Sequence, residues 1–303
     1  MDDSPGDGWV TRLRGGLVTL MLRRRLRVNT ARRAFVRIFA IECSPDELDQ
    51  LDRIDGTQIT ELGNLVRYWL GMLRPLPYVR ALWFGRAARR DLAPRRIRQF
   101  LSAMPRCGAW AHDIRAIIIP PLPGGASPGG LLIHEVTHAL LDLLTAHFPY
   151  PRGISEGFAE YMVSSVGVRT YDGRAEGYSL NWQKPGRGSM DDPPFMSIRD
   201  ILTFDAREHW GLDPDAFTRM TWASSWLYAY LLARGRQRPR LPWILRELRL
   251  KNVTGPEAVY CWLQEASGME ANALEDDFTR YCRLGARRGS QDAEGGGAET
   301  QTS

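Results

Sequence analysis

Two histidines one helical turn apart, with a glutamate directly after the first, form the segment of this sequence best suited to chemistry. The segment His134-Glu135-Val136-Thr137-His138 is an HExxH motif. In a helix, residues i and i+4 lie on the same face, so both imidazoles can bind one metal ion. Glu135 can then act as a general base on a water at that metal. The motif predicts a catalytic zinc site; the alternative is a helix whose two histidines are hydrogen-bonded and bind no metal.

A zinc ion needs a third protein ligand, and catalysis requires an open fourth position. The segment Ile154–Tyr161 reads ISEGFAEY and places Glu156 and Glu160 one turn apart on a predicted helix. The 17 residues between His138 and Glu156 are enough to end one helix, turn at two prolines and begin a second helix alongside. Glu156 is therefore the predicted third ligand, and Glu160 is expected to accept the free N–H of a ligand imidazole. The alternative is a pair of solvent-facing glutamates.

HExxH followed by S-E-G-F-A-E-Y resembles the gluzincin metallopeptidases, and most closely the peptidase MA-like family. Three flanking segments are also similar to that family, and with them the resemblance spans about residues 34–284. The flanking segments are Phe195–Leu202 (FMSIRDIL), Trp222–Trp226 (WASSW) and Leu274–Phe278 (LEDDF).

The resemblance implies a zincin-like fold and hydrolysis of peptide bonds in a peptide or protein substrate. It implies that His134, His138 and Glu156 bind Zn²⁺, that Glu135 is the general base, and that no other cofactor is needed. The sequence departs from the family at Trp222, where the family often has a tyrosine whose hydroxyl can donate a hydrogen bond to the oxyanion.

The indole N–H of Trp222 can also donate one hydrogen bond, so Trp222 is kept as the possible oxyanion donor. Because its shape differs from that of tyrosine, a second hypothesis stays open. In that hypothesis the protein is a catalytically weak or inactive, zinc-stabilised binding domain, whereas the intact Glu135 favours an enzyme. The alternative oxyanion donors are Tyr171, Tyr178, His209 and Tyr228.

Basic residues are concentrated near the N-terminus. Of the 303 residues, 38 are arginine and two are lysine, and the formal net charge is +5. Nine of the arginines fall between Arg12 and Arg37, and no acidic residue occurs from Gly8 to Ile41. A solvated basic arm is the simplest interpretation. Contact with nucleic acid or a membrane surface through this arm is the alternative, although no nucleic-acid-binding motif accompanies it.

The composition, with 44% hydrophobic and 25% charged residues, is that of a globular protein and excludes collagen-like, coiled-coil and wholly disordered chains. No run of apolar residues is long enough for a transmembrane helix. Four cysteines without CxxC spacing predict neither a disulfide framework nor a cysteine zinc site. The N-terminus also lacks the pattern of a signal peptide, so we expect a reducing, cytoplasmic setting.

The pattern of apolar residues predicts an α+β fold, in which a small mixed sheet packs on helices and the C-terminal half is helical. We expect a basic leader over residues 1–30, one metallopeptidase domain over 31–284 and a disordered tail over 285–303. His112 is either a surface histidine or part of a segment, 108–113, that faces peptide. Predicted strands cover residues 34–41, 79–84 and 114–119. Predicted helices cover residues 44–73 with a weak point at Asp55-Gly56, 94–104, 127–147, 154–163, 198–202, 218–233, 241–250, 256–266 and 271–284.

Overall fold

The computed structural model describes residues 27–52, 54–88, 93, 95–103, 108–121, 128–166, 196–204 and 214–295, although not every side chain within these ranges. The chain divides into two compact units. Unit 1 comprises residues 1–60 and 77–139, and unit 2 comprises residues 61–76 and 140–303. The predicted α+β class is confirmed, since one five-stranded sheet is accompanied by helices that dominate the C-terminal half.

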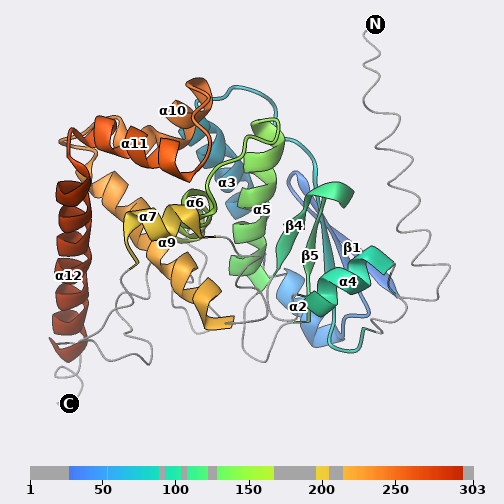
Figure 1. The fold of residues 1–303 in the computed structure, drawn as a ribbon. Helices are drawn as coiled ribbons and strands as arrows, with labels where there is room; N and C mark the ends of the chain where they lie inside the picture. The colour runs from blue at the N-terminus through green and yellow to red at the C-terminus, as the bar shows by residue number, and fades with distance from the viewer. Residues whose placement is uncertain are drawn as a thin grey trace, which may run out of the picture. The chain divides into compact units, whose positions relative to one another are not determined.

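Unit 1 contains the sheet, whose strands lie in the order β1-β2-β3-β5-β4 (Figure 1). The three central strands are parallel, whereas β1 and β4 pair antiparallel at the two edges. Parallel strands are normally covered on both faces, which explains why the central strands are apolar at nearly every position. The strands are β1 Val28–Arg33, β2 Val36–Ile41, β3 Val79–Phe84, β4 Ala109–Ala111 and β5 Ala116–Ile119.

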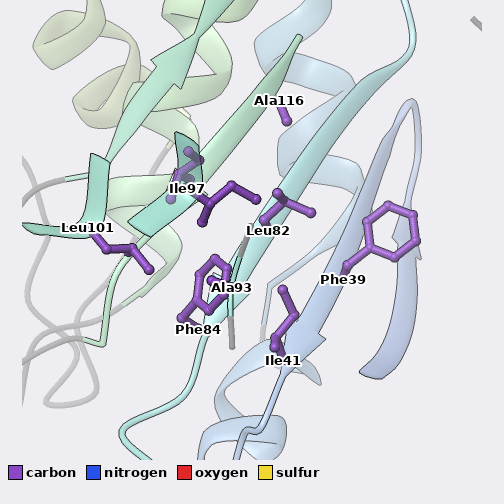
Figure 2. Close-up of a cluster of buried hydrophobic side chains, with 9 residues drawn as sticks. Phe39, Ile41, Leu82, Phe84, Ala93, Ile97, Leu101 and Ala116 are labelled. Carbon is purple, nitrogen blue, oxygen red and sulfur yellow. The ribbon is translucent and has the colours of Figure 1, made fainter. Parts of the chain in front are cut away.

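One face of this sheet carries the core shown in Figure 2. Alternate residues of neighbouring strands lie opposite one another, as with Phe39 and Leu82, and Ile41 and Phe84. Helix α4, Arg95–Ala103, packs Ile97 and Leu101 onto the same cluster. The predicted helix over 94–104 is confirmed in position, and its apolar stripe is what covers this face.

Helix α2, Pro45–Asp52, begins within one residue of the start of the predicted helix 44–73. The hydroxyl of Ser44 accepts the N–H of Glu47, and the Glu47 carboxylate accepts the N–H of Ser44, which makes a capping box. The other oxygen of Glu47 accepts the N–H of Arg86, 2.9 Å away, just after β3. The weak point at Asp55-Gly56 is a true break, after which α3 runs from Gly56 to Leu70.

Unit 2 is helical in its described part. Helix α6, Arg152–Ser165, packs closely on α9, Pro214–Arg234, because Gly157 lets the backbone of Ser224 approach; a Cβ atom at Gly157 would lie 2.3 Å from the Ser224 carbonyl oxygen. Helix α5, Pro128–Leu144, is continuous across the boundary between the units. The helices are α6 Arg152–Ser165, α7 Ile198–Thr203, α9 Pro214–Arg234, α10 Ile244–Leu250 after a 3-10 turn at 241–243, α11 Pro256–Ser267 and α12 Ala271–Gly295.

Several predicted boundaries were wrong. The predicted strand 34–41 is the second half of a hairpin, and β1 begins at Val28, inside the predicted leader. The predicted strand 114–119 begins at Ala116, because His112–Ile114 form a 3-10 turn and Arg115 has a left-handed backbone.

The chain ends differ from the sequence prediction as well. Helix α12 continues to Gly295, eleven residues into the predicted disordered tail of 285–303. The rest of that tail and most of the predicted leader lie outside the described residues.

Candidate metal centre

The candidate centre is built on α5, which begins with Pro128 at its first turn, where the missing N–H costs nothing. The face of α5 that carries Val136 and Leu140 is fully buried. Thr137 is buried too, and its hydroxyl donates to the Ile133 carbonyl oxygen at 2.8 Å. These contacts fix the rotation of the helix, and His134 and His138 lie on a face that is only partly buried.

The two imidazoles of the motif converge. Their Nε2 atoms lie 3.1 Å apart, with the ring planes at 68° to one another. Two zinc–nitrogen bonds of about 2.0–2.1 Å at the tetrahedral angle would place their nitrogens about 3.3 Å apart. One ligand atom from each of His134, His138 and Glu156 lies within 4.8 Å of the others. The donor set and the spacing of the two nitrogens therefore fit a zinc ion.

Glu135 points its carboxylate into a buried position, with only 5% of the residue exposed. Gly108, the residue before β4, makes room for it: a Cβ atom at Gly108 would lie 3.0 Å from Glu135 Cγ. The sequence analysis grouped Gly108 with a segment that faces peptide but did not connect it to Glu135. Nothing local in the sequence marks this contact, because the two residues are brought together by the fold of unit 1.

Glu156 and Glu160 lie on α6 and are 3% and 4% exposed, so neither is a solvent-facing glutamate. Buried carboxylates require cations or hydrogen-bond donors around them. Arg152, one turn before Glu156, places its Nε atom 3.2 Å from Glu156 Oε1. Sequence analysis missed Arg152, although its i,i+4 spacing to Glu156 is visible in the sequence. The ion pair explains part of the burial of Glu156 without a metal.

Helix α9 supplies a buried tyrosine next to α6. Tyr228 packs its ring against Phe158 and Tyr161, with ring centres 5.4 Å away in both cases. Burial raises the pKa of the Tyr228 phenol well above its usual value, and its hydroxyl has no hydrogen-bond partner within the described part of the chain. Tyr228 is thus the one alternative oxyanion donor that the structure describes. Trp222 lies on α9 but its side chain is outside the described part, as are Tyr171, Tyr178 and His209.

A second group of possible metal ligands comprises His112, Asp142 and His147. His147 follows the end of α5, where both it and Ala146 have positive φ angles. This turn directs the His147 N–H to the Asp142 carbonyl oxygen and its Nδ1 to the Asp142 carboxylate, at 2.7 Å. The contact between these two residues is therefore explained by the way the helix ends.

Comparison with models of known protein families gives no match, and comparison with curated proteins gives none either. Within the described residues, no helix combines the length and the apolar character that a membrane span requires.

Proposed function

We propose that this protein is a zinc-dependent metallopeptidase with a zincin-like catalytic centre. His134, His138 and Glu156 would hold the ion, and Glu135 would be the general base. The observation that carries the proposal is the grouping of these three donors beside a buried carboxylate, with the two imidazole nitrogens 3.1 Å apart. Zinc, when bound, would supply Lewis acidity that polarises the scissile carbonyl and lowers the pKa of water.

Side chains of the protein would transfer the proton and orient the metal ligands. Glu135 would accept a proton from the attacking water and return it to the leaving amine, which a carboxylate held in a partly dry site can do. Gly108 would matter here because a Cβ atom at that position would lie 3.0 Å from Glu135 Cγ and crowd the carboxylate. Glu160 would orient a ligand imidazole, as buried carboxylates do beside metal sites.

The edge strand β4 suggests where a substrate would bind. Strand β4 is at the edge of the sheet and directly follows Gly108. A peptide in extended conformation can add to such an edge through main-chain hydrogen bonds. A peptide bound along β4 would run past the residue that contacts Glu135. This arrangement favours a peptide or protein substrate over a small molecule.

The second hypothesis is a zinc-stabilised binding domain that does not turn over substrate. Trp222 favours it, because the indole differs in shape from the tyrosine that the family often has at this place. The two hypotheses agree on the metal and differ only in the function of Glu135. A substitution at Glu135 therefore distinguishes them.

The test compares Glu135→Gln, Glu156→Gln and Glu270→Gln, an exposed control outside the proposed site, by zinc content, melting temperature with and without zinc, and cleavage of a peptide library. Parent and Glu270→Gln should bind one zinc and gain melting temperature from it, because a ligand that binds only the folded state stabilises it. Glu156→Gln should lose most of the zinc. Glu135→Gln should keep the zinc but cleave at least about a hundredfold more slowly, the usual contribution of a general base.

Each outcome has a distinct meaning. A parent protein that takes up no zinc contradicts the metal site altogether. A parent that binds zinc but cleaves no peptide supports the binding domain. Equal cleavage by parent and Glu135→Gln shows that the assigned base is wrong.

A further inference from the structure

Three of the four large apolar side chains that are exposed in the described part of the chain lie in one place in unit 2. They are Tyr68 at the end of α3, Leu73 in the following loop and Leu250 at the end of α10. Leu73 is 99% exposed, so it gains nothing from the fold that contains it. Isolated exposed leucines are common, but a group of them marks a contact surface. The fourth such side chain, Leu284, lies on α12.

The segments that carry these side chains are neighbours, as the positions of α3 and α10 in Figure 1 also indicate. The ring of Tyr68 lies 5.2 Å from the ring of Trp243, just before α10. The backbone at Gly71 lies against the side chain of Arg246. Leu70, two residues after Tyr68, accepts a hydrogen bond through its carbonyl oxygen from Arg249, the residue before Leu250. The end of α3 and its loop therefore run along α10.

Four arginines lie in the same two segments as these apolar side chains. Arg67, Arg74, Arg246 and Arg249 form no ion pair with a carboxylate within the described part of the chain; the bonds of Arg67 go to Asn64 and to a backbone oxygen, and that of Arg249 goes to the Leu70 carbonyl oxygen. The one acidic residue of α10, Glu247, already pairs with Arg240 and Lys251. We name Tyr68, Leu73 and Leu250 with these four arginines the apolar–basic patch. The patch carries a net positive charge.

We propose that the apolar–basic patch binds the surface of a membrane that contains anionic lipids. Exposed leucines gain free energy when they enter the boundary between headgroups and acyl chains, and flanking arginines interact with lipid phosphates from the same position. Nucleic acid fits less well, because bases are held by stacking on aromatic rings and two of the three exposed apolar side chains are leucines. The proposal does not depend on the metal centre or on the basic arm of residues 12–37.

The test measures sedimentation of the full chain with vesicles of phosphatidylcholine alone and with added phosphatidylserine. The parent should bind only the vesicles that contain phosphatidylserine. Leu73→Ser should weaken that binding by about tenfold or more, on the scale of one buried leucine side chain. Arg74→Gln combined with Arg246→Gln should weaken it by about thirtyfold at low salt, on the scale of two surface charges.

Matched controls come from unit 2 itself. Leu284→Ser removes the exposed leucine outside the patch, and Arg236→Gln removes an exposed arginine outside it; both variants should bind like the parent. All substituted residues are exposed, so melting temperatures should stay close to that of the parent. Failure of the parent to bind anionic vesicles would overturn the proposal, as would equal binding by Leu73→Ser. Binding of an RNA oligonucleotide or self-association that is lost in the patch variants, without vesicle binding, would assign the patch to those partners instead.

Discussion

At the scale of single residues, burial decides which ionisable groups are reactive. Glu135, Glu156 and Glu160 are each at most 5% exposed, which would be unfavourable for charged carboxylates without nearby cations. Arg152 supplies one positive charge beside Glu156. A divalent cation held by His134, His138 and Glu156 would supply more, so the burial of these carboxylates is consistent with the proposed metal.

Burial makes two cysteine thiols, those of Cys43 and Cys282, less reactive. Desolvation raises the pKa of Cys43 to about 12, with a further contribution from the charge of Glu47, and burial alone raises the pKa of Cys282 to about 12. Cys261 is exposed. In a Cys107→Ser background, a thiol reagent at pH 8 should modify only Cys261 in the folded protein, and the other two only in denaturant. Rapid modification of three thiols without denaturant would contradict the burial of Cys43 and Cys282.

The raised pKa values of Cys43 and Cys282 predict how the stability of the fold changes at high pH. Above the unfolded-state pKa of 9.0, the unfolded chain releases thiol protons that the folded chain retains. The free energy of unfolding should therefore fall as pH rises from about 9 toward about 12. A Cys43→Ala, Cys282→Ala variant measured by urea unfolding should show a shallower decline, and an unchanged slope would argue against these raised pKa values.

At the scale of elements, the contact between α6 and α9 holds the third proposed ligand in place. Gly157, next to Glu156, is essential to this contact because a Cβ atom there would lie 2.3 Å from the Ser224 carbonyl oxygen. Gly157→Ala should lower the free energy of unfolding by about 1–3 kcal/mol, the usual cost of overpacking, as measured by urea unfolding.

Gly56→Ala is the matched control for Gly157→Ala, since the nearest atom to a Cβ at Gly56 is 3.9 Å away. Alanine is the better helix former, so this variant should be neutral or slightly more stable. Equal effects of the two substitutions would show that the close approach of α6 to α9 is not what makes Gly157 necessary.

Elements determined by nearby residues were the ones that the sequence predicted well. The capping box of Ser44 and Glu47 and the shared face of His134 and His138 depend on spacings of three and four residues, which the sequence displays directly. Strands β1 and β4 were missed because their assignment depends on partners in another strand. The contact of Gly108 with Glu135 was missed for the same reason. The zinc ligands, the general base and the substrate class remain predictions.

At the scale of the whole molecule, the C-terminal helix divides into an anchored part and an extension. Leu274, Phe278 and Cys282 are buried at intervals of four residues. Asp277 accepts two hydrogen bonds from the Arg234 guanidinium, at 2.9 and 2.7 Å, and so links α12 to α9. Arg283 and Leu284 are already exposed. The anchoring contacts of α12 that the structure describes therefore end at Cys282.

Removal of residues 285–303 should consequently leave the melting temperature nearly unchanged, because all the anchoring contacts that the structure describes are retained. Differential scanning calorimetry of the truncated chain checks this. Removal of residues 274–303 is the comparison, and it should lower the melting temperature strongly because three buried side chains and the Asp277 link are lost. A large drop for the shorter truncation would mean that the extension packs against the protein.

The pairing of α3 with α10 has a consequence for the time course of biosynthesis. The Leu70 carbonyl oxygen accepts a hydrogen bond from Arg249, 179 residues later, and Trp69 packs its ring against Trp243. A ribosome adds about 5–20 residues per second. The second half of α3 is therefore synthesised on the order of 10–35 seconds before α10, on which it packs. During that interval the nascent chain leaves Trp69 and its neighbours exposed. Unit 2 can complete its core only late in synthesis, and the waiting segment is a natural binding site for chaperones.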